Sequence, residues 1–133
     1  MQLADLWLNS KHQIENKQVH QIIAFTGDGQ LRDESAVSLE FREFLTLVPI
    51  DYLRKYTEQC LGNSFKDSGL VLQDLVNEMG RRLGFEVTNG RYRGSTKEIG
   101  NDGLWKLQSE SEHSIIIEVK TTDAFRIDLN TIA

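Results

Sequence analysis

The spacing of apolar residues changes along the chain, from helical spacing in the first part to strand spacing in the last part. Residues 11–25 and 35–48 place isoleucine, valine, leucine or phenylalanine at helical spacing among polar neighbours. Pro49 ends the second segment, because proline has no N–H to donate within a helix. A short third helix is expected from Asp51, whose carboxylate suits an N-cap, to Gly62.

The fourth helix has the clearest pattern. It is expected to begin at Asp67 or Ser68, either of which can cap it, and to stop at Gly84. Arg81 and Arg82 fall in its last turn, where the helix dipole favours positive charge. One apolar stripe is expected along it, formed by Leu72, Leu75, Val76, Met79 and Leu83.

After this helix the pattern is that of a three-strand antiparallel meander. The strands are expected over residues 85–88, 102–108 and 114–120, and the last has β-branched residues at four of its seven positions. Residues 109–113 are expected to form a polar turn. Trp105 should face the layer opposite Asp102, which favours core packing. The fold class is therefore α/β or α+β, with helices before the sheet.

The composition of the chain limits the classes of function that it can have. The 133 residues fit one domain, with 15 basic against 20 acidic residues and a net charge of −5. A protein that binds nucleic acid by bulk charge would be basic, so contact with a polyanion needs a local patch or metal ions. The single cysteine, Cys60, excludes an internal disulfide. No apolar run approaches a membrane span and no signal peptide is evident, so we expect a cytoplasmic protein without a membrane partner.

Two acids and a lysine stand out near the strand ends. Glu118 and Lys120 alternate on the last strand and share a face, and Asp102 opens the preceding strand. A hairpin register can bring Asp102 beside Glu118, giving hard oxygen ligands that suit Mg²⁺ or Mn²⁺. The residues alone equally allow an edge strand with a surface salt bridge between Glu118 and Lys120. Glu-x-Lys is a common tripeptide, and it also occurs at Glu15-Asn16-Lys17.

The sequence Asn101-Asp102…Ile116-Ile117-Glu118-Val119-Lys120 resembles the PD-(D/E)XK superfamily of restriction-endonuclease-like nucleases. The resemblance covers residues 67–133, after a helical region over residues 1–66. It implies a helix, the meander, a second helix and a further strand. It also implies that Asp102, Glu118 and the Val119 carbonyl bind the metal, and that Lys120 serves the attacking water.

The resemblance therefore implies a cytoplasmic, prokaryotic endonuclease that hydrolyses DNA with Mg²⁺ or Mn²⁺, in restriction or defence. Two positions depart from the pattern of the family. Asn101 stands where the family name has proline, and Gln73 stands where many members have a helix glutamate. Gln73 is expected to support the site, and Asp74 or Glu78 nearby can substitute for the missing glutamate.

Arg91 and Arg93 flank Tyr92 on a loop bounded by glycines. They are expected to contact DNA phosphates beside the site, and the alternative is a solvated loop. A catalytically inactive DNA-binding or assembly module of the same fold, and an RNA nuclease, are the rival functions. Residues 121–133 are too few for a helix and a strand, so we also expect self-association or a longer protein that completes the core.

Overall fold

The computed structural model describes residues 2–63, 65–90, 102–107 and 110–119. In this part the protein is α+β, with five α-helices, one 3₁₀ turn and three strands. The helices are α1 (Leu3–Asn9), α2 (Val19–Ala24), α3 (Ala36–Leu47), α4 (Ile50–Gly62) and α5 (Ser68–Arg82), and the 3₁₀ turn is Lys11–Gln13. The strands are β1 (Phe85–Asn89), β2 (Gly103–Leu107) and β3 (Glu110–Ile117). No helix of the described residues is long and apolar enough to cross a membrane.

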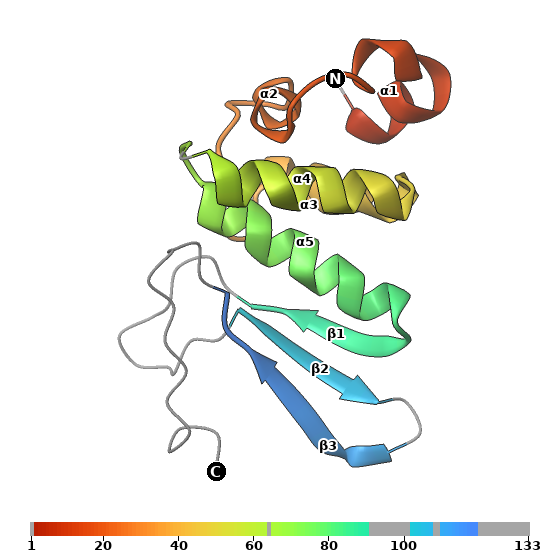
Figure 1. Cartoon of the computed structure of the whole chain (residues 1–133), viewed down its shortest axis with the longest axis vertical. Coiled ribbons are helices and arrows are strands. Elements are labelled where there is room, and N and C mark those ends of the chain that lie inside the picture. The colour runs from red at the N-terminus through yellow and green to blue at the C-terminus, as the bar shows by residue number, and fades with distance from the viewer. Residues whose placement is uncertain (1, 64, 91–101, 108–109, 120–133) are drawn as a thin grey trace.

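The elements are stacked in layers, with α1 and α2 at one end, then α3 and α4, then α5, and the sheet at the other end (Figure 1). The apolar core lies among the helices, and its largest fully buried side chains include Tyr56, Phe41 and Phe44. Helix α5 packs against α4 and α3 on one side and against β1 and β2 on the other. It is therefore the element that joins the helical core to the sheet.

The expected helices over residues 35–48 and 67–84 are confirmed as α3 and α5. Local signals set their ends. The Ser35 hydroxyl accepts a hydrogen bond from the Ser38 N–H at 3.2 Å, as an N-cap does. Gly84, just beyond α5, has a φ of 99°, a backbone conformation that glycine adopts readily.

The continuous helix expected over residues 11–25 is wrong. The 3₁₀ turn Lys11–Gln13 comes first, and α2 begins only at Val19. The side chain of Gln59, on α4, accepts the Val19 N–H at 2.7 Å, and the Gln21 side chain accepts the Gln18 N–H at 3.0 Å. In a continuous helix these two N–H groups would bond carbonyls of the preceding turn. Here side chains accept them, so α2 can begin at Val19.

Two further boundaries are corrected. Pro49, rather than Asp51, is the N-cap residue of α4, and Asp51 lies in the first turn, where its charge still suits the helix dipole. Strand β3 begins at Glu110, so residues 110–113 belong to the strand and not to a turn. The strand begins there because Leu107 of β2 pairs with Glu110. A register shift between Lys106 and Leu107 allows this pair and leaves a shorter connection between the two strands than expected.

The apolar stripe expected on α5 is only partly correct. Leu72 and Leu75 are buried, whereas Leu83 is 71% exposed. Four polar side chains are buried in addition: Gln73, Asp74, Asn77 and Glu78. A helix covered on two sides buries more than one stripe, and its polar side chains then need partners inside the protein.

Arginines supply the partners of the two buried acids. Arg42 Nε lies 3.0 Å from Asp74 Oδ1, and Arg82 Nε lies 3.0 Å from Glu78 Oε2. Arg82 also donates to the Leu45 carbonyl at 2.9 Å, near the end of α3. These bonds tie α5 to the helical layer.

The sheet has the order β1-β2-β3, with both neighbouring pairs antiparallel. Trp105 faces α5, as expected, because its indole lies against Gly80 and bonds Asn77. Val119, just after β3, packs against the helical core, whereas Ile115 and Ile116 are 47% and 69% exposed. The self-association expected for this strand stays a prediction.

The close packing of α5 on β2 predicts an unfavourable Gly80→Ala substitution. A Cβ at position 80 would lie 2.6 Å from the Trp105 ring. The clash should lower the free energy of unfolding by about 1–3 kcal/mol, although alanine favours helices. Gly62→Ala is the matched control, because a Cβ there meets nothing within 4 Å and should be neutral or stabilising. Urea denaturation of the two variants measures both values, and equal effects would contradict the packing.

The buried Cys60 thiol gives a pH-dependent prediction. Burial raises the pKa of this thiol to about 12, above its ordinary value of 9. The unfolded chain ionises first as the pH rises, so the contribution of this group to stability is present below pH 9 and is lost above it. A thiol reagent at pH 8 should therefore react slowly with the native protein and rapidly in denaturant. Cys60→Ser should remove the reaction, and fast reaction of the native protein would contradict the prediction.

Candidate active site

The candidate site lies where β2 begins and β3 ends. The last pair in the register of these strands is Gly103 with Ile117. Beyond this pair the Asp102 N–H bonds Ile117 rather than Glu118, so the regular pairing of the two strands ends here. The two acids that the sequence singled out therefore flank the last pair at one end of the sheet, and the face that their side chains are expected to share stays a prediction. Asp102 is half-buried and Glu118 is exposed.

Asp102 is held in place by both its main chain and its side chain. Its N–H donates to the Ile117 carbonyl at 2.9 Å, and its carboxylate oxygen Oδ2 accepts the Val119 N–H at 2.6 Å. Its carbonyl accepts the Gly90 N–H at 3.1 Å and the Asn77 side-chain N–H at 2.7 Å. The carboxylate is thus tethered across the strand pair, to the peptide N–H between Glu118 and Val119.

Gln73 lies on α5, buried under the end of β1. Its Nε2 donates to the Gly90 carbonyl at 3.0 Å, and Gly90 in turn bonds the main chain of Asp102. Gln73 therefore supports the strand next to the site. Asp74 and Glu78, the alternatives on the same helix, are ion-paired with arginines of the helices. These different partners could not be predicted, because the sequence does not show which faces of α5 are covered.

Several of the expected site residues lie outside the described residues. These are Lys120, Arg91, Arg93 and Asn101. The face shared by Lys120 and Glu118, and the contact of the two arginines with DNA, stay predictions.

The donor atoms at this end of the sheet fit a hard divalent cation. The candidate ligands are the Asp102 and Glu118 carboxylates and the Val119 carbonyl, all of them oxygens. Mg²⁺ is commonly held by one or two carboxylates and keeps several waters. Among the described residues there is no group of three or more histidine, cysteine, aspartate or glutamate side chains that could hold a metal. A closed site of three or four protein ligands, as zinc prefers, is not formed by these residues.

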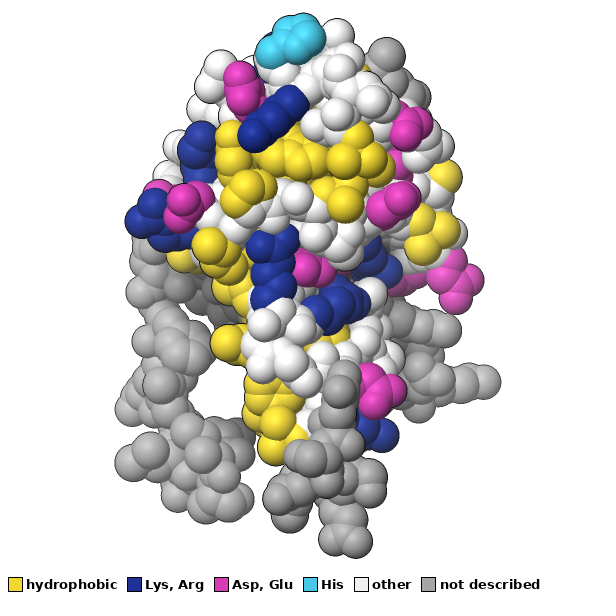
Figure 2. All heavy atoms as spheres, turned by 90° about the vertical axis from the view of Figure 1, so that its right-hand side faces the viewer, with side chains coloured by type: hydrophobic (Ala, Val, Ile, Leu, Met, Phe, Trp, Pro, Cys, Tyr) yellow, Lys and Arg dark blue, Asp and Glu magenta, His cyan; other side chains and the backbone are white. Residues whose placement is uncertain are grey.

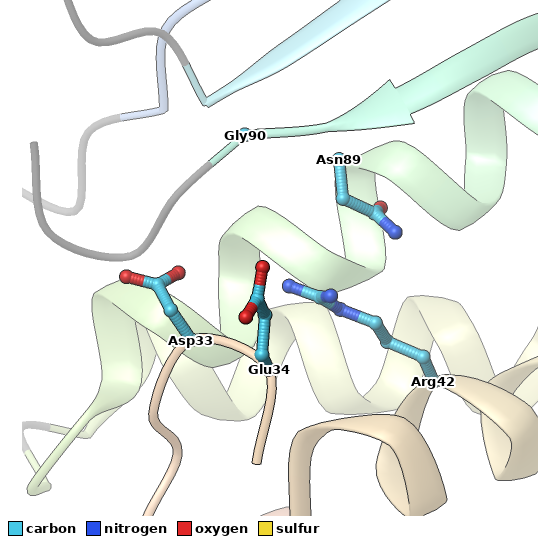
Figure 3. A pocket seen from close by; sticks show the side chains of 5 residues that line it. All are labelled: Asp33, Glu34, Arg42, Asn89 and Gly90. Carbon is cyan, nitrogen blue, oxygen red and sulfur yellow. The ribbon is translucent and has the colours of Figure 1, made fainter.

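A cavity of about 340 Å³ lies beside the site and is lined by Asp33, Glu34, Arg42, Asn89 and Gly90. The Glu34 carboxylate and the Arg42 guanidinium point toward one another within it (Figure 3). Gly90 belongs to the cavity wall and also bonds the Asp102 carbonyl, so the cavity adjoins the candidate site. This cavity was not expected, because an acidic pair before a helix cap has the pattern of an ordinary loop.

Three comparisons with known proteins give no match. No family model, no curated protein and no solved structure matches this chain.

The hydrogen bonds predict different roles in folding for the two acids. Asp102→Ala removes the acceptor of the Val119 N–H and should lower the free energy of unfolding by about 1–3 kcal/mol. Glu118→Ala changes an exposed side chain and should stay within about 0.5 kcal/mol of the wild type. Denaturant unfolding without metal measures both values. Equal losses would show that the carboxylate of Asp102 does not tether the strand ends.

Proposed function

We propose that this protein is a metal-dependent, restriction-endonuclease-like nuclease that hydrolyses DNA phosphodiester bonds with Mg²⁺ or Mn²⁺. The observation that supports this most directly is the 2.6 Å hydrogen bond from the Val119 N–H to the Asp102 carboxylate. It joins two of the three residues expected to bind the metal, just beyond the last register pair of β2 and β3, which is Gly103 with Ile117.

The order of elements supports the same proposal. Helix α5 is followed by a three-strand antiparallel meander, as the resemblance to the PD-(D/E)XK superfamily implies for residues 67–120. Residues 120–133, which follow the meander and are too few for the second helix and further strand of that family, lie outside the described residues.

In the proposed mechanism each residue has a separate task. Asp102, Glu118 and the Val119 carbonyl would hold the ion, and Lys120 would orient the water that attacks phosphorus. The bound ion supplies charge that stabilises the phosphate oxygens and lowers the pKa of the water. The tether between Asp102 and Val119 keeps two of these groups in a fixed relation before substrate arrives.

The charge distribution requires local contacts with DNA. Lys and Arg side chains are interspersed with Asp and Glu on the face shown in Figure 2, which has no continuous basic surface among the side chains drawn in colour. The net charge of −5 also opposes DNA at long range. Attraction at the site would come from the ion and from Arg91 and Arg93, which we propose contact the phosphates.

A second candidate is an inactive DNA-binding or assembly module of the same fold. Gln73 favours it, because a neutral amide bonded to the Gly90 carbonyl replaces the helix carboxylate that many family members use. An RNA nuclease is the third candidate, and the substrate test below includes RNA.

Metal binding is tested first by thermal unfolding. A cation that binds only the folded protein stabilises it, by about 2.7 kcal/mol at 100 times its Kd. Mn²⁺ should therefore raise the Tm of the wild type. Glu118→Gln should keep the Tm of the metal-free protein and lose most of this rise. A wild type whose Tm ignores millimolar Mn²⁺ would argue for the inactive module.

Cleavage is tested on supercoiled plasmid and on RNA of matched length, with Mg²⁺ or EDTA. Wild type should nick the plasmid with Mg²⁺ only, and Glu118→Gln should lose this activity. Glu15→Gln is the matched control, since it alters the other Glu-x-Lys of the chain and should leave cleavage unchanged. Cleavage of RNA alone would favour the RNA nuclease. Metal binding without any cleavage would favour the inactive module.

A further inference from the structure

Asn77 links helix α5 to the start of β2 by both ends of its side-chain amide. It is fully buried. Its Nδ2 donates to the Asp102 carbonyl at 2.7 Å, and its Oδ1 accepts the Trp105 indole N–H at 2.9 Å. No feature of the sequence resemblance involves this residue.

Trp105 sets the orientation of the Asn77 amide. An indole N–H can only donate, so it requires the amide oxygen on its side. The amide nitrogen then faces the Asp102 carbonyl, which can only accept. The two bonds together allow one orientation of the side chain and exclude the flipped one.

Two glycines make room for this contact. A Cβ at Gly103 would lie 2.0 Å from Asn77 Oδ1, and a Cβ at Gly80 would lie 2.6 Å from the Trp105 ring. Any other residue at Gly103 would push the amide away from the Asp102 main chain. The close approach of α5 and β2 therefore requires glycine at positions 80 and 103, where Trp105 and Asn77 fill the space.

The series of hydrogen bonds ends at the candidate metal ligands. Trp105 donates to Asn77, Asn77 donates to the Asp102 carbonyl, and the Asp102 carboxylate accepts the Val119 N–H. Displacement of the Asp102 main chain would move its carboxylate as well. The side chain of Asn77 bonds the main chain of Asp102 and none of the groups expected to bind the metal. It therefore acts on the site only through Asp102.

We propose that Asn77 is a positioning residue, which holds Asp102 so that its carboxylate is ready for the divalent cation. This inference rests on the proposed function and deepens it. Partners that orient metal ligands in this way typically contribute 10–100-fold to metal affinity. Trp105 assists by fixing the amide of Asn77.

The test uses the full chain with Asn77→Leu, which has a similar shape but can neither donate nor accept. Isothermal titration with Mn²⁺ should give a Kd about 10-fold or more above that of the wild type. Amide hydrogen exchange without metal should be faster at Val119, while the amides of the β1–β2 ladder stay protected. Val71→Ala is the control, because it removes buried packing from α5 and should leave both readouts unchanged.

Trp105→Phe keeps the inference testable if Asn77→Leu does not fold. It retains a ring beside Gly80 but removes the indole N–H, so it should also weaken Mn²⁺ binding and speed exchange at Val119. Unchanged Mn²⁺ affinity and exchange in the folded variants would overturn the inference. A wild-type protein that binds no Mn²⁺ would overturn the proposed function. If the wild type binds Mn²⁺ and the variants bind it equally well, only this inference is overturned.

Discussion

The structure depends on the hydrogen bonds of the polar side chains buried on α5. Because the helix is covered on two sides, any of these groups left without a partner would cost about 1–3 kcal/mol. Asp74 pairs with Arg42 of α3, and Glu78 pairs with Arg82 of α5 itself, which also bonds the Leu45 carbonyl of α3. Gln73 and Asn77 bond carbonyls at the ends of the strands. The first pair holds the helices together, and the second fixes the start of β2, where Asp102 lies.

The fold was predictable where local signals decide it. The apolar spacing over residues 35–48 and the glycine at position 84 are visible in the sequence, and α3 and the end of α5 follow from them. The start of α2 was not predictable, because Gln59 accepts the Val19 N–H from another helix. A bond between residues 40 positions apart leaves no local pattern.

The candidate site was predictable only in part. Strand alternation predicted the antiparallel pairing of β2 with β3, which brings Asp102 to the end of β3, where it bonds Ile117 and Val119. The face expected to be shared by Asp102 and Glu118 stays a prediction. Asn77 could not be found in this way. A polar residue on a helix normally indicates a solvent-facing position, and only the packing of Trp105 and Gly103 against the helix shows that it is buried.

The departure at Gln73 has a physical reason in the structure. Its Nε2 donates to the Gly90 carbonyl, and a glutamate could do this only in its protonated form. A side chain at this position therefore either binds the strand, as an amide, or binds a cation, as a carboxylate. With glutamine, an ion bound at this end of the sheet as proposed would have two carboxylates and a carbonyl from the described residues, and water would complete its coordination. That arrangement suits Mg²⁺, which gives up its waters reluctantly, better than an ion that needs a full set of protein ligands.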